Sequence, residues 1–421
     1  MTRLARSLPA LVVLGGIAMA TLSPGTIAEA STPMFCLVCG SLGTVDVILN
    51  VALFLPLGWA LAFAGMSWRQ AIVTCLATSL AIESLQFAVI AGRDATISDL
   101  LTNTLGGAIG AWTMAHWRPL VASERRQAQC ASMGFAAAAL LIMAATAWLL
   151  RPALPRMLLW GQWTPQHQQF EPYSGHLATF AVNRIPIPYG LIAIPDSVRT
   201  AYLRYEAVPR IEFLSGHAPQ RTSAIARIGG ERWELFLLGA SGERFVFRAS
   251  LRTRYLRLRT PSAAVAGALG GAGENVTAEA QLQRDGWRMR VSRPSGTVER
   301  LVPFSVALGW SMLLPFEHPM EAHDVWWSAV WLGALVFPCA LWGALARLGP
   351  TTTGSRGRTL SFLPVASVAA GLAVIPWAAH FAPASPIEWG GVLLGAALAT
   401  WLAPWLKRRA LQPSLQAEDG T

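Results

Sequence analysis

The chain has 421 residues, of which 53% are hydrophobic and only 13% charged, and its formal net charge is +10. About a quarter of the residues of a soluble globular protein are charged, so this composition excludes an ordinary soluble domain and indicates a polytopic membrane protein. The arginines lie at the ends of apolar runs or scattered through the middle of the chain, and a nucleic-acid-binding protein is excluded because no compact basic patch exists.

Long apolar runs occur at both ends of the chain. Each is long enough, or nearly so, to cross a hydrocarbon core about 30 Å thick. We therefore predict an α-helical polytopic membrane protein with about eight transmembrane helices. The predicted spans are residues 8–27, 46–65, 70–91, 99–116, 132–150, 325–346, 360–379 and 387–406.

The first apolar run has two interpretations. It fits a retained membrane helix, and it also fits a secretory signal peptide followed by a cleavage site. The uncharged run from Ser7 to Ala28 is long for the apolar core of a signal peptide, which favours the retained helix.

Basic residues orient the predicted spans, because cytoplasmic loops carry an excess of Lys and Arg. With the N-terminus in the cytoplasm, the short outer loops hold Arg93 and almost no other basic residue. Alanine, arginine and glycine are abundant, as in many bacterial proteins, so we expect the bacterial cytoplasmic (inner) membrane. The cytoplasmic basic residues are then Arg3, Arg6, Arg69, Arg118, Arg125, Arg126, Arg347, Arg356, Arg358, Lys407, Arg408 and Arg409.

Residues 157–316 break the apolar pattern and predict an extracytoplasmic antiparallel β-sandwich. Short runs such as RIEFL, RFVFRA, RTAYLRY and RYLRLRT alternate arginine with apolar residues, and turn-forming residues separate them. We expect Glu231, Glu234 and Glu243 to be solvated strand residues. The segment resembles, in architecture only, a concanavalin A-like or laminin-G-like domain. Glycan binding and docking to an envelope protein are both open roles for this domain.

The chain is thus expected to have four parts. Residues 1–150 form a domain of five transmembrane helices, and residues 157–316 form the β domain. Residues 325–406 form a segment of three transmembrane helices, and residues 407–421 form a cytoplasmic tail.

Three consecutive spans each carry one polar stripe on an otherwise apolar helix. Residues three, four or seven apart share a helix face, and a rise of 1.5 Å per residue puts all three stripes in the outer half of the bilayer. We therefore predict a shared polar pocket open to the outside, over which Arg93 closes to pair with a carboxylate. The stripe residues, together with the adjacent loop acid, are Asp46, Asn50, Ser79, Glu83, Gln86, Asp94, Asp99 and Asn103.

An ionised carboxylate in hydrocarbon costs at least about 2.5–3.5 kcal/mol, so Glu83 must be paired, protonated or hydrated. The polar stripes are explained either by hydrogen bonds that only join helices or by a pocket that binds a ligand. Two acids and one arginine exceed what joining helices requires. The glycines Gly106, Gly107 and Gly110 allow close helix approach, and Pro56 frees a carbonyl and permits a kink.

Cys36 and Cys39 form a CxxC motif in the outer loop before the second span. A local disulfide, two idle thiols and redox activity are all open for this pair. A zinc site needs two more ligands, and neither a second CxxC nor a nearby histidine pair exists. We expect no metal and no cofactor.

The polar stripes also carry a family resemblance. The stretches NVALFLPLGWAL, IESLQ and GRDATISDLLTNTLGGAIG resemble the VanZ-like membrane protein family over about residues 8–150. Many members have an acidic residue where this chain has Thr96. The matching positions are Asn50, Phe54, Pro56, Gly58, Glu83, Gln86, Arg93, Asp99, Asn103 and Gly110, with Gly106 and Gly107 between the last two.

The resemblance implies an integral membrane protein that handles an amphiphile, a lipopeptide antibiotic or an envelope precursor at the outer leaflet. It also implies a link to teicoplanin-type glycopeptide resistance or to cell-envelope homeostasis. The expected partners are a membrane lipid or a lipid-linked envelope component. A membrane-embedded hydrolase or transferase with Glu83 as general base, and a non-catalytic scaffold acting through the β domain, are the alternatives. The sequence favours a non-enzymatic protein, because it shows no nucleophile elbow and no P-loop.

Overall fold

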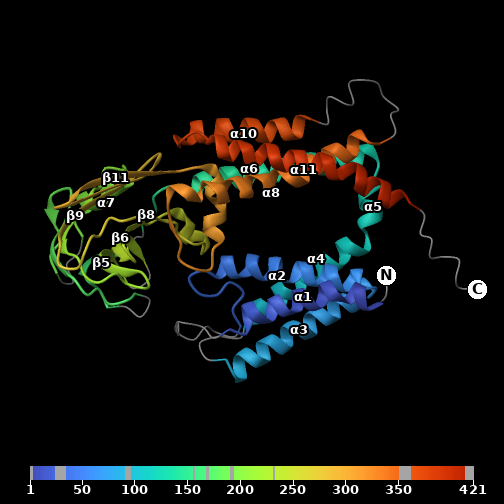
Figure 1. Cartoon of the computed structure of the whole chain (residues 1–421), viewed down its shortest axis with the longest axis horizontal. Helices are drawn as coiled ribbons and strands as arrows, with labels where there is room; N and C mark the ends of the chain where they lie inside the picture. The colour runs from blue at the N-terminus through green and yellow to red at the C-terminus, as the bar shows by residue number, and fades with distance from the viewer. Residues whose placement is uncertain are drawn as a thin grey trace, which may run out of the picture. The chain divides into compact units, whose positions relative to one another are not determined.

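The computed structural model describes residues 3–23, 35–90, 96–154, 157–166, 170–189, 194–230, 233–349 and 362–412. The chain forms two compact units. Figure 1 shows their helices and strands, coloured along the chain. The helical unit comprises Met1–Ala136, Leu335–Ala366 and Leu394–Thr421, and the β unit comprises Ala137–Ala334 and Ser367–Leu393.

All eight predicted spans contain a helix. The helices are α1 (Arg3–Thr21), α2 (Gly43–Phe63), α3 (Trp68–Ala88), α4 (Ile97–Ala115), α6 (Arg125–Leu149), α8 (Val325–Arg347), α10 (Leu363–Ala379) and α11 (Pro386–Leu411). Within the described residues, α2, α3, α6, α8 and α11 are long and apolar enough to cross a membrane, and α10 and residues 6–21 of α1 form shorter apolar helices. The chain is therefore a multi-pass membrane protein.

Helices α1 to α4 pack side by side in the helical unit (Figure 1). Their shared core contains Ile17 of α1, Phe54 and Leu57 of α2, and Cys75 and Ile82 of α3. Many large apolar side chains on the outside of these helices are exposed, among them Val73, Leu101 and Trp112. A helix that is apolar all round, with its outer face uncovered by protein, is the arrangement that lipid requires.

The ends of α6, α8 and α11 that belong to the helical unit form a second small core. Ala128 of α6 packs with Ala344 and Leu345 of α8 and Ala403 of α11. The Ser132 hydroxyl donates to the Cys339 carbonyl at 2.8 Å, which joins α6 to α8. Small side chains let these helices approach closely, as is usual where lipid supplies no hydrophobic driving force. The short helix α5 (Trp117–Val121) follows α4.

Two six-stranded sheets form the β unit. The first sheet has the order β1-β5-β6-β7-β8-β12, and the second has the order β11-β10-β9-β4-β2-β3. All neighbouring pairs are antiparallel except β8 and β12, which are parallel. The strands are β1 (Trp160–Trp163), β2 (His176–Val182), β3 (Ile185–Pro186), β4 (Pro209–Leu214), β5 (Ser223–Gly229), β6 (Glu234–Ser241), β7 (Arg244–Ala249), β8 (Ser262–Val265), β9 (Asn275–Gln283), β10 (Gly286–Arg293), β11 (Gly296–Pro303) and β12 (Pro319–Met320).

The two sheets differ in how they are covered. Every residue of β5 and β6 is buried, so the middle of the first sheet is covered on both faces. In β9 of the second sheet, buried residues such as Val276 and Ala278 alternate with more exposed ones. That alternation indicates one face on the core and one face toward solvent. The sheets touch through β2 with β5 and through β8 with β11.

Two runs that predicted strands are not strands. The RTAYLRY run contributes to helix α7 (Asp196–Leu203), and its Tyr202 packs edge-on against Phe236 of β6 at 5.1 Å between ring centroids. The RYLRLRT run contributes to the 3-10 helix η1 (Arg252–Leu256), which ends at Arg257 in a left-handed conformation. Alternation over only a few residues does not separate a strand from one or two helical turns, and tertiary packing decides between them.

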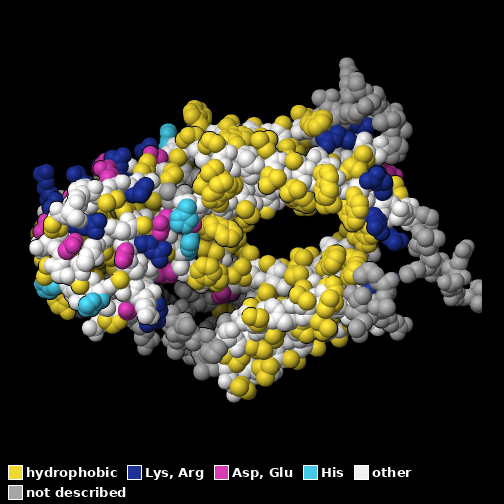
Figure 2. Space-filling model, in the orientation of Figure 1, with side chains coloured by type: hydrophobic (Ala, Val, Ile, Leu, Met, Phe, Trp, Pro, Cys, Tyr) yellow, Lys and Arg dark blue, Asp and Glu magenta, His cyan; other side chains and the backbone are white. Residues whose placement is uncertain are grey.

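On the face drawn in Figure 2, hydrophobic side chains cover most of the helices, whereas charged side chains gather over the sheets and at some helix ends. The exposed apolar residues of the span-forming helices include Leu80 and Phe87 of α3 and Leu393, Leu394 and Trp401 of α11. Apolar surface on this scale is unfavourable in water and favourable against acyl chains. The surface thus agrees with a membrane protein that carries a polar β unit.

Candidate functional site

The polar stripes of α2, α3 and α4 come together where α4 begins. Ser67 and Gln70 form a capping box at the start of α3, and the Thr96 hydroxyl caps α4 by accepting from the Asp99 backbone N–H at 3.2 Å. Caps of this kind satisfy the first free N–H groups of a helix and fix where it starts. The cap therefore fixes the residue at which α4 starts, and this in turn fixes the helix face on which Asp99 and Asn103 lie.

Two side-chain hydrogen bonds join the three stripes. The Asn50 amide of α2 donates to an Asp99 carboxylate oxygen of α4 at 2.6 Å. The Asn103 amide of α4 donates to the Ser79 hydroxyl of α3 at 3.0 Å. We call the group Asn50, Ser79, Glu83, Asp99 and Asn103 the polar seam.

Glu83 lies inside the polar seam with its side chain only 8% exposed. Its carboxylate accepts from the Thr96 backbone N–H at 3.0 Å, and it lies near enough to Asp99 for the two carboxyl groups to interact electrostatically. Both acids are at the N-terminal end of α4, where the helix dipole favours negative charge. The Thr96 N–H and the helix dipole thus partly offset the cost of burying two acidic side chains, which repel each other when both are ionised.

Asn103 holds an unsatisfied polar atom. The residue is 3% exposed, and its side-chain oxygen has no hydrogen-bond partner among the described residues, although its amide nitrogen donates to Ser79. A buried acceptor without a donor costs roughly 1–3 kcal/mol. The polar seam therefore presents an acceptor to which a donor from outside the described residues can bind.

Helices α2 and α4 come into backbone contact at four glycines, which are Gly58 of α2 and Gly106, Gly107 and Gly110 of α4. A Cβ on Gly58 would lie 1.9 Å from the Gly107 carbonyl oxygen, one on Gly106 would lie 2.2 Å from the Val51 oxygen, and one on Gly110 would lie 1.9 Å from the Leu55 oxygen. No side chain larger than hydrogen fits at these positions. Pro56 of α2 lies in the same stretch of helix and cannot donate to the carbonyl four residues earlier.

The remaining predicted site residues fall at the margin of the polar seam or beyond the described residues. Asp46 is exposed in the first turn of α2. The Gln86 amide donates to the Thr21 carbonyl of α1 at 2.9 Å, so Gln86 joins α3 to α1 and does not reach α4 through this bond. Arg93 and Asp94 lie outside the described residues.

Cys36 and Cys39 form a disulfide. Between them, the Leu37 carbonyl accepts from the Ser98 hydroxyl of α4 at 2.7 Å. The disulfide loop is thereby attached to α4 one residue before Asp99. Within the described residues, no group of three or more His, Cys, Asp or Glu side chains could hold a metal ion.

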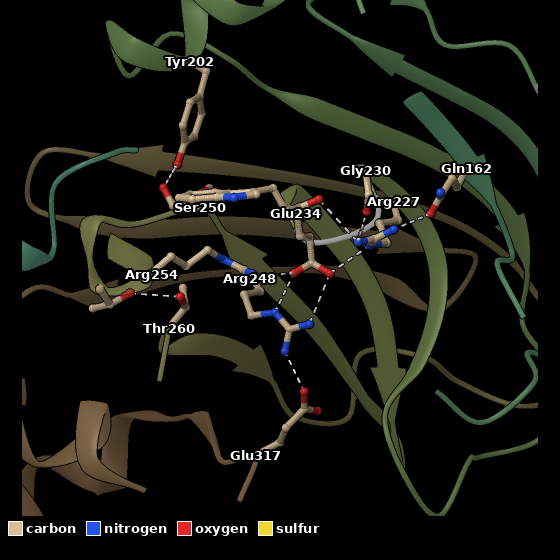
Figure 3. Close-up of polar contacts among 12 residues, drawn as sticks. Gln162, Tyr202, Arg227, Gly230, Glu234, Arg248, Ser250, Arg254, Thr260 and Glu317 are labelled. Atoms are coloured by element: carbon tan, nitrogen blue, oxygen red, sulfur yellow. Dashed lines mark hydrogen bonds and ion pairs between the residues drawn. The ribbon is translucent and has the colours of Figure 1, made fainter. Parts of the chain in front are cut away.

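A buried charge network in the β unit was not predicted. Glu234 of β6 is 3% exposed, not solvated as expected. Its carboxylate accepts from Arg248 of β7 at 2.6 Å and from Arg227 of β5 at 3.1 Å, and Arg254 lies 3.6 Å away (Figure 3). Burial raises the pKa of Glu234, but the arginines outweigh burial and lower that pKa to about 2. The sequence does show an arginine in each strand beside β6, Arg227 in β5 and Arg248 in β7. It does not show the strand register that places both of them next to Glu234.

The comparison with family models supports the assignment of the N-terminal part. Residues 9–118 match the VanZ/LLP1 family model, a stretch that includes the polar seam and the four glycines. This part of the chain is therefore VanZ-like. Neither the comparison with curated proteins nor the comparison with solved structures found a match.

Proposed function

We propose that the VanZ-like part binds the polar head of an amphiphile, such as a membrane lipid, a lipopeptide antibiotic or a lipid-linked envelope precursor, at the polar seam. The observation that carries this proposal is the buried Asn103 oxygen that has no donor among the described residues. Asn103 lies on α4, four residues after Asp99, whose carboxylate accepts from the Asn50 amide. A hydroxyl or amine of a headgroup supplies the missing donor.

The binding roles in this proposal follow from the polar seam. Glu83 and Asp99 provide negative charge at the start of α4, and Asn50 and Asn103 orient the headgroup by hydrogen bonds. We assign Arg93 to the anionic group of the ligand because it follows α3 in the chain. Asp46 and Gln86 contribute less to binding in this proposal. Asp46 is exposed, and the Gln86 amide donates to α1.

The proposed location is the bacterial cytoplasmic membrane, with the polar seam in the outer leaflet and the β unit outside. The excess of basic residues in the loops on the other side supports this placement. On this placement, the protein contributes to cell-envelope homeostasis or to glycopeptide resistance. The β unit contacts an envelope protein or glycan.

A structural scaffold is the second candidate. The Asn50–Asp99 and Asn103–Ser79 bonds favour it, because polar groups that bond to one another across helices need no ligand. In that case the polar seam only holds α2, α3 and α4 together. The β unit would then be the working part.

Lipids that co-purify with the detergent-extracted protein, identified by mass spectrometry, test the proposal. Glu83→Gln and Asn103→Ala are compared with wild type and with Ser84→Ala, whose exposed hydroxyl bonds only to its own helix at Leu80. We expect a specific amphiphile in wild type and Ser84→Ala. In the two seam variants, its retention should fall about tenfold or more, the effect of one lost hydrogen bond to a charged or buried group. Equal lipid profiles at equal yields would favour the scaffold.

A further inference from the structure

Arginines of the β unit gather around one tyrosine where α6 ends. The Arg252 guanidinium lies 5.1 Å from the ring centre of Trp148 in the last turn of α6, and the Arg252 N–H donates to the Arg151 carbonyl at 3.0 Å. The Arg284 guanidinium lies 5.8 Å from the ring centre of Tyr205. Burial raises the pKa of Tyr205, and these three arginines together oppose the rise. The end of α6, η1, the loop after α7 and the turn between β9 and β10 therefore meet at Tyr205.

Tyr205 is held at the centre of this group by its backbone. Its φ angle is 64°, in the left-handed region that only glycine enters freely. The Tyr205 N–H donates to the Tyr202 carbonyl at 3.0 Å, and the Tyr205 carbonyl accepts from the Gln281 amide of β9 at 2.8 Å. These two bonds fix the tyrosine between helix α7 and the second sheet.

Two helix ends place the group near the lipid headgroups. Helix α6 is long and apolar enough to cross a membrane, and Trp148 at its end is 45% exposed. Exposed tryptophans at the ends of membrane helices mark the headgroup level. The Asp285 carbonyl, beside Arg284, accepts from the Phe304 N–H at 2.7 Å, and the Phe304 ring lies 5.4 Å from Phe381, two residues after α10. The turn that carries Arg284 is thus also connected to the end of an apolar helix.

Positive charge is in excess around Tyr205. Four arginines adjoin it in space or in the chain, and none of them forms an ion pair with a described carboxylate. We call them the basic patch, and they are Arg151, Arg204, Arg252 and Arg284. The acids beside them in the chain are Glu206 and Asp285, which leave two positive charges in excess. Arg254 of η1 is not counted, because Glu234 balances it at 3.6 Å.

The basic patch also has the donors and the apolar neighbours of an interfacial surface. A ring under a guanidinium group leaves the N–H groups at the guanidinium edge available. Within the described part of the chain, the side-chain N–H groups of Arg252 and Arg284 have no acceptor. Leu203, Tyr255 and Leu256 are exposed beside the arginines. Arginine among exposed aromatic and aliphatic side chains is typical of surfaces that lie in the membrane interface.

We propose that the basic patch docks the β unit on the anionic phospholipid headgroups of the bilayer that α6 crosses. A guanidinium group pairs with two phosphate oxygens at once, and Trp148 and Tyr205 hold two of these groups by their faces. Anionic headgroups also supply the negative charge that the surface lacks. This proposal concerns the β unit and does not depend on the polar seam.

Hydrogen exchange of the full-length protein tests the proposal. The protein is placed in phosphatidylcholine nanodiscs that contain a rising fraction of phosphatidylglycerol. The reporting amides are those of η1 and of residues 284–286. Arg252→Gln and Arg284→Gln each remove one charge from the basic patch.

The matched control is Arg221→Gln, which removes one exposed arginine elsewhere in the β unit. Arg221 lies two residues before Ser223 of β5, which pairs with Ala240 of β6. Leu235, five residues earlier in β6, accepts from the Ser250 N–H close to η1. Five residues of strand span about 17 Å, so the control lies well away from the basic patch.

We expect the reporting amides to become protected as phosphatidylglycerol increases. The midpoint should move to an about fivefold higher lipid fraction in each patch variant, the effect of one basic residue near an anionic surface, and should stay unchanged in the control. High salt should weaken the protection in wild type, because it screens exposed charges.

Three results would overturn the proposal. Exchange that is the same with and without phosphatidylglycerol would mean that no anionic headgroup is recognised. An equal shift in Arg221→Gln would mean that net charge alone attracts the lipid. Wild-type protection that does not respond to salt would exclude docking by charge, and this series decides even if a patch variant unfolds η1 in phosphatidylcholine alone.

Discussion

The Asn50 amide of α2 donates to the Asp99 carboxylate of α4 at 2.6 Å, although 49 residues separate them in the chain. This bond lies beside the start of α4, where Glu83 accepts from the Thr96 N–H. Two acids and two amides from three helices thus share one region. Such a group is costly in lipid unless its members bond to one another or to a ligand.

The Asn50–Asp99 bond should contribute measurably to the stability of the helical unit. Interhelical hydrogen bonds in membrane proteins contribute about 0.6 kcal/mol on average and up to about 1.7 kcal/mol. A double-mutant cycle with Asn50→Ala and Asp99→Ala, followed by unfolding in mixed micelles, should give a coupling energy in that range. A coupling energy of zero would mean that the bond adds nothing to stability.

The contact between α2 and α4 should not tolerate a methyl group at Gly110. A Cβ there would lie 1.9 Å from the Leu55 oxygen, so Gly110→Ala must push the helices apart. We expect a loss of about 1–3 kcal/mol in the free energy of unfolding, the usual cost of overpacking.

Gly134→Ala in α6 is the matched control for Gly110→Ala. A Cβ at Gly134 meets nothing within 4 Å, and alanine is the better helix former by about 1 kcal/mol. The control should therefore be neutral or slightly stabilising. If both variants behaved alike, close packing would not be the reason for glycine at position 110.

The charge network should make the β unit sensitive to loss of Glu234. Glu234→Gln leaves Arg227 and Arg248 buried without their carboxylate, and breaking a buried ion pair costs about 3–5 kcal/mol. Amide hydrogen exchange in β5, β6 and β7 should speed up. Glu299→Gln, on the exposed side of β11, should change stability by no more than about 0.5 kcal/mol.

The same network predicts how acid affects the β unit. The pKa of Glu234 is lowered from its ordinary value of 4.5 to about 2, so its stabilising contribution is fully present above pH 4.5 and is lost as pH falls toward 2. The lowered pKa of Glu317 acts in the same direction. The protection factors of the amides in β6 and β7, which compare each exchange rate with that of an unfolded chain at the same pH, should therefore fall below pH 4.5. Protection factors that stay constant down to pH 2 would contradict this role of Glu234.

The disulfide should hold the loop that is attached to α4. A cross-link over so short a loop contributes on the order of 2 kcal/mol by restricting the unfolded chain. Reduction should accelerate hydrogen exchange around Leu37 and Ser98, whose bond depends on the loop position. The Cys36→Ser/Cys39→Ser variant should resemble the reduced protein and show no further response to reductant.

Helices were the features that the sequence predicted best. The apolar runs are long, and the hydrogen bonds of a helix are local, so composition and length are enough to place one. Their polar stripes could also be read, because helical periodicity assigns Asn50, Glu83 and Asp99 to defined faces. The pattern from Asn50 to Gly110 added the VanZ-like resemblance, which the match over residues 9–118 supports.

Partners across the chain were decided only by the tertiary structure. The sequence shows that Glu83 needs a partner but not that the partner is the Thr96 N–H. Likewise, RTAYLRY alternates like a strand yet lies in helix α7, where Tyr202 packs on Phe236. Glu234 reads as an exposed strand residue, but the register of β5, β6 and β7 surrounds it with arginines. Local periodicity determines which face a side chain occupies, whereas its burial and charge environment depend on contacts between distant segments.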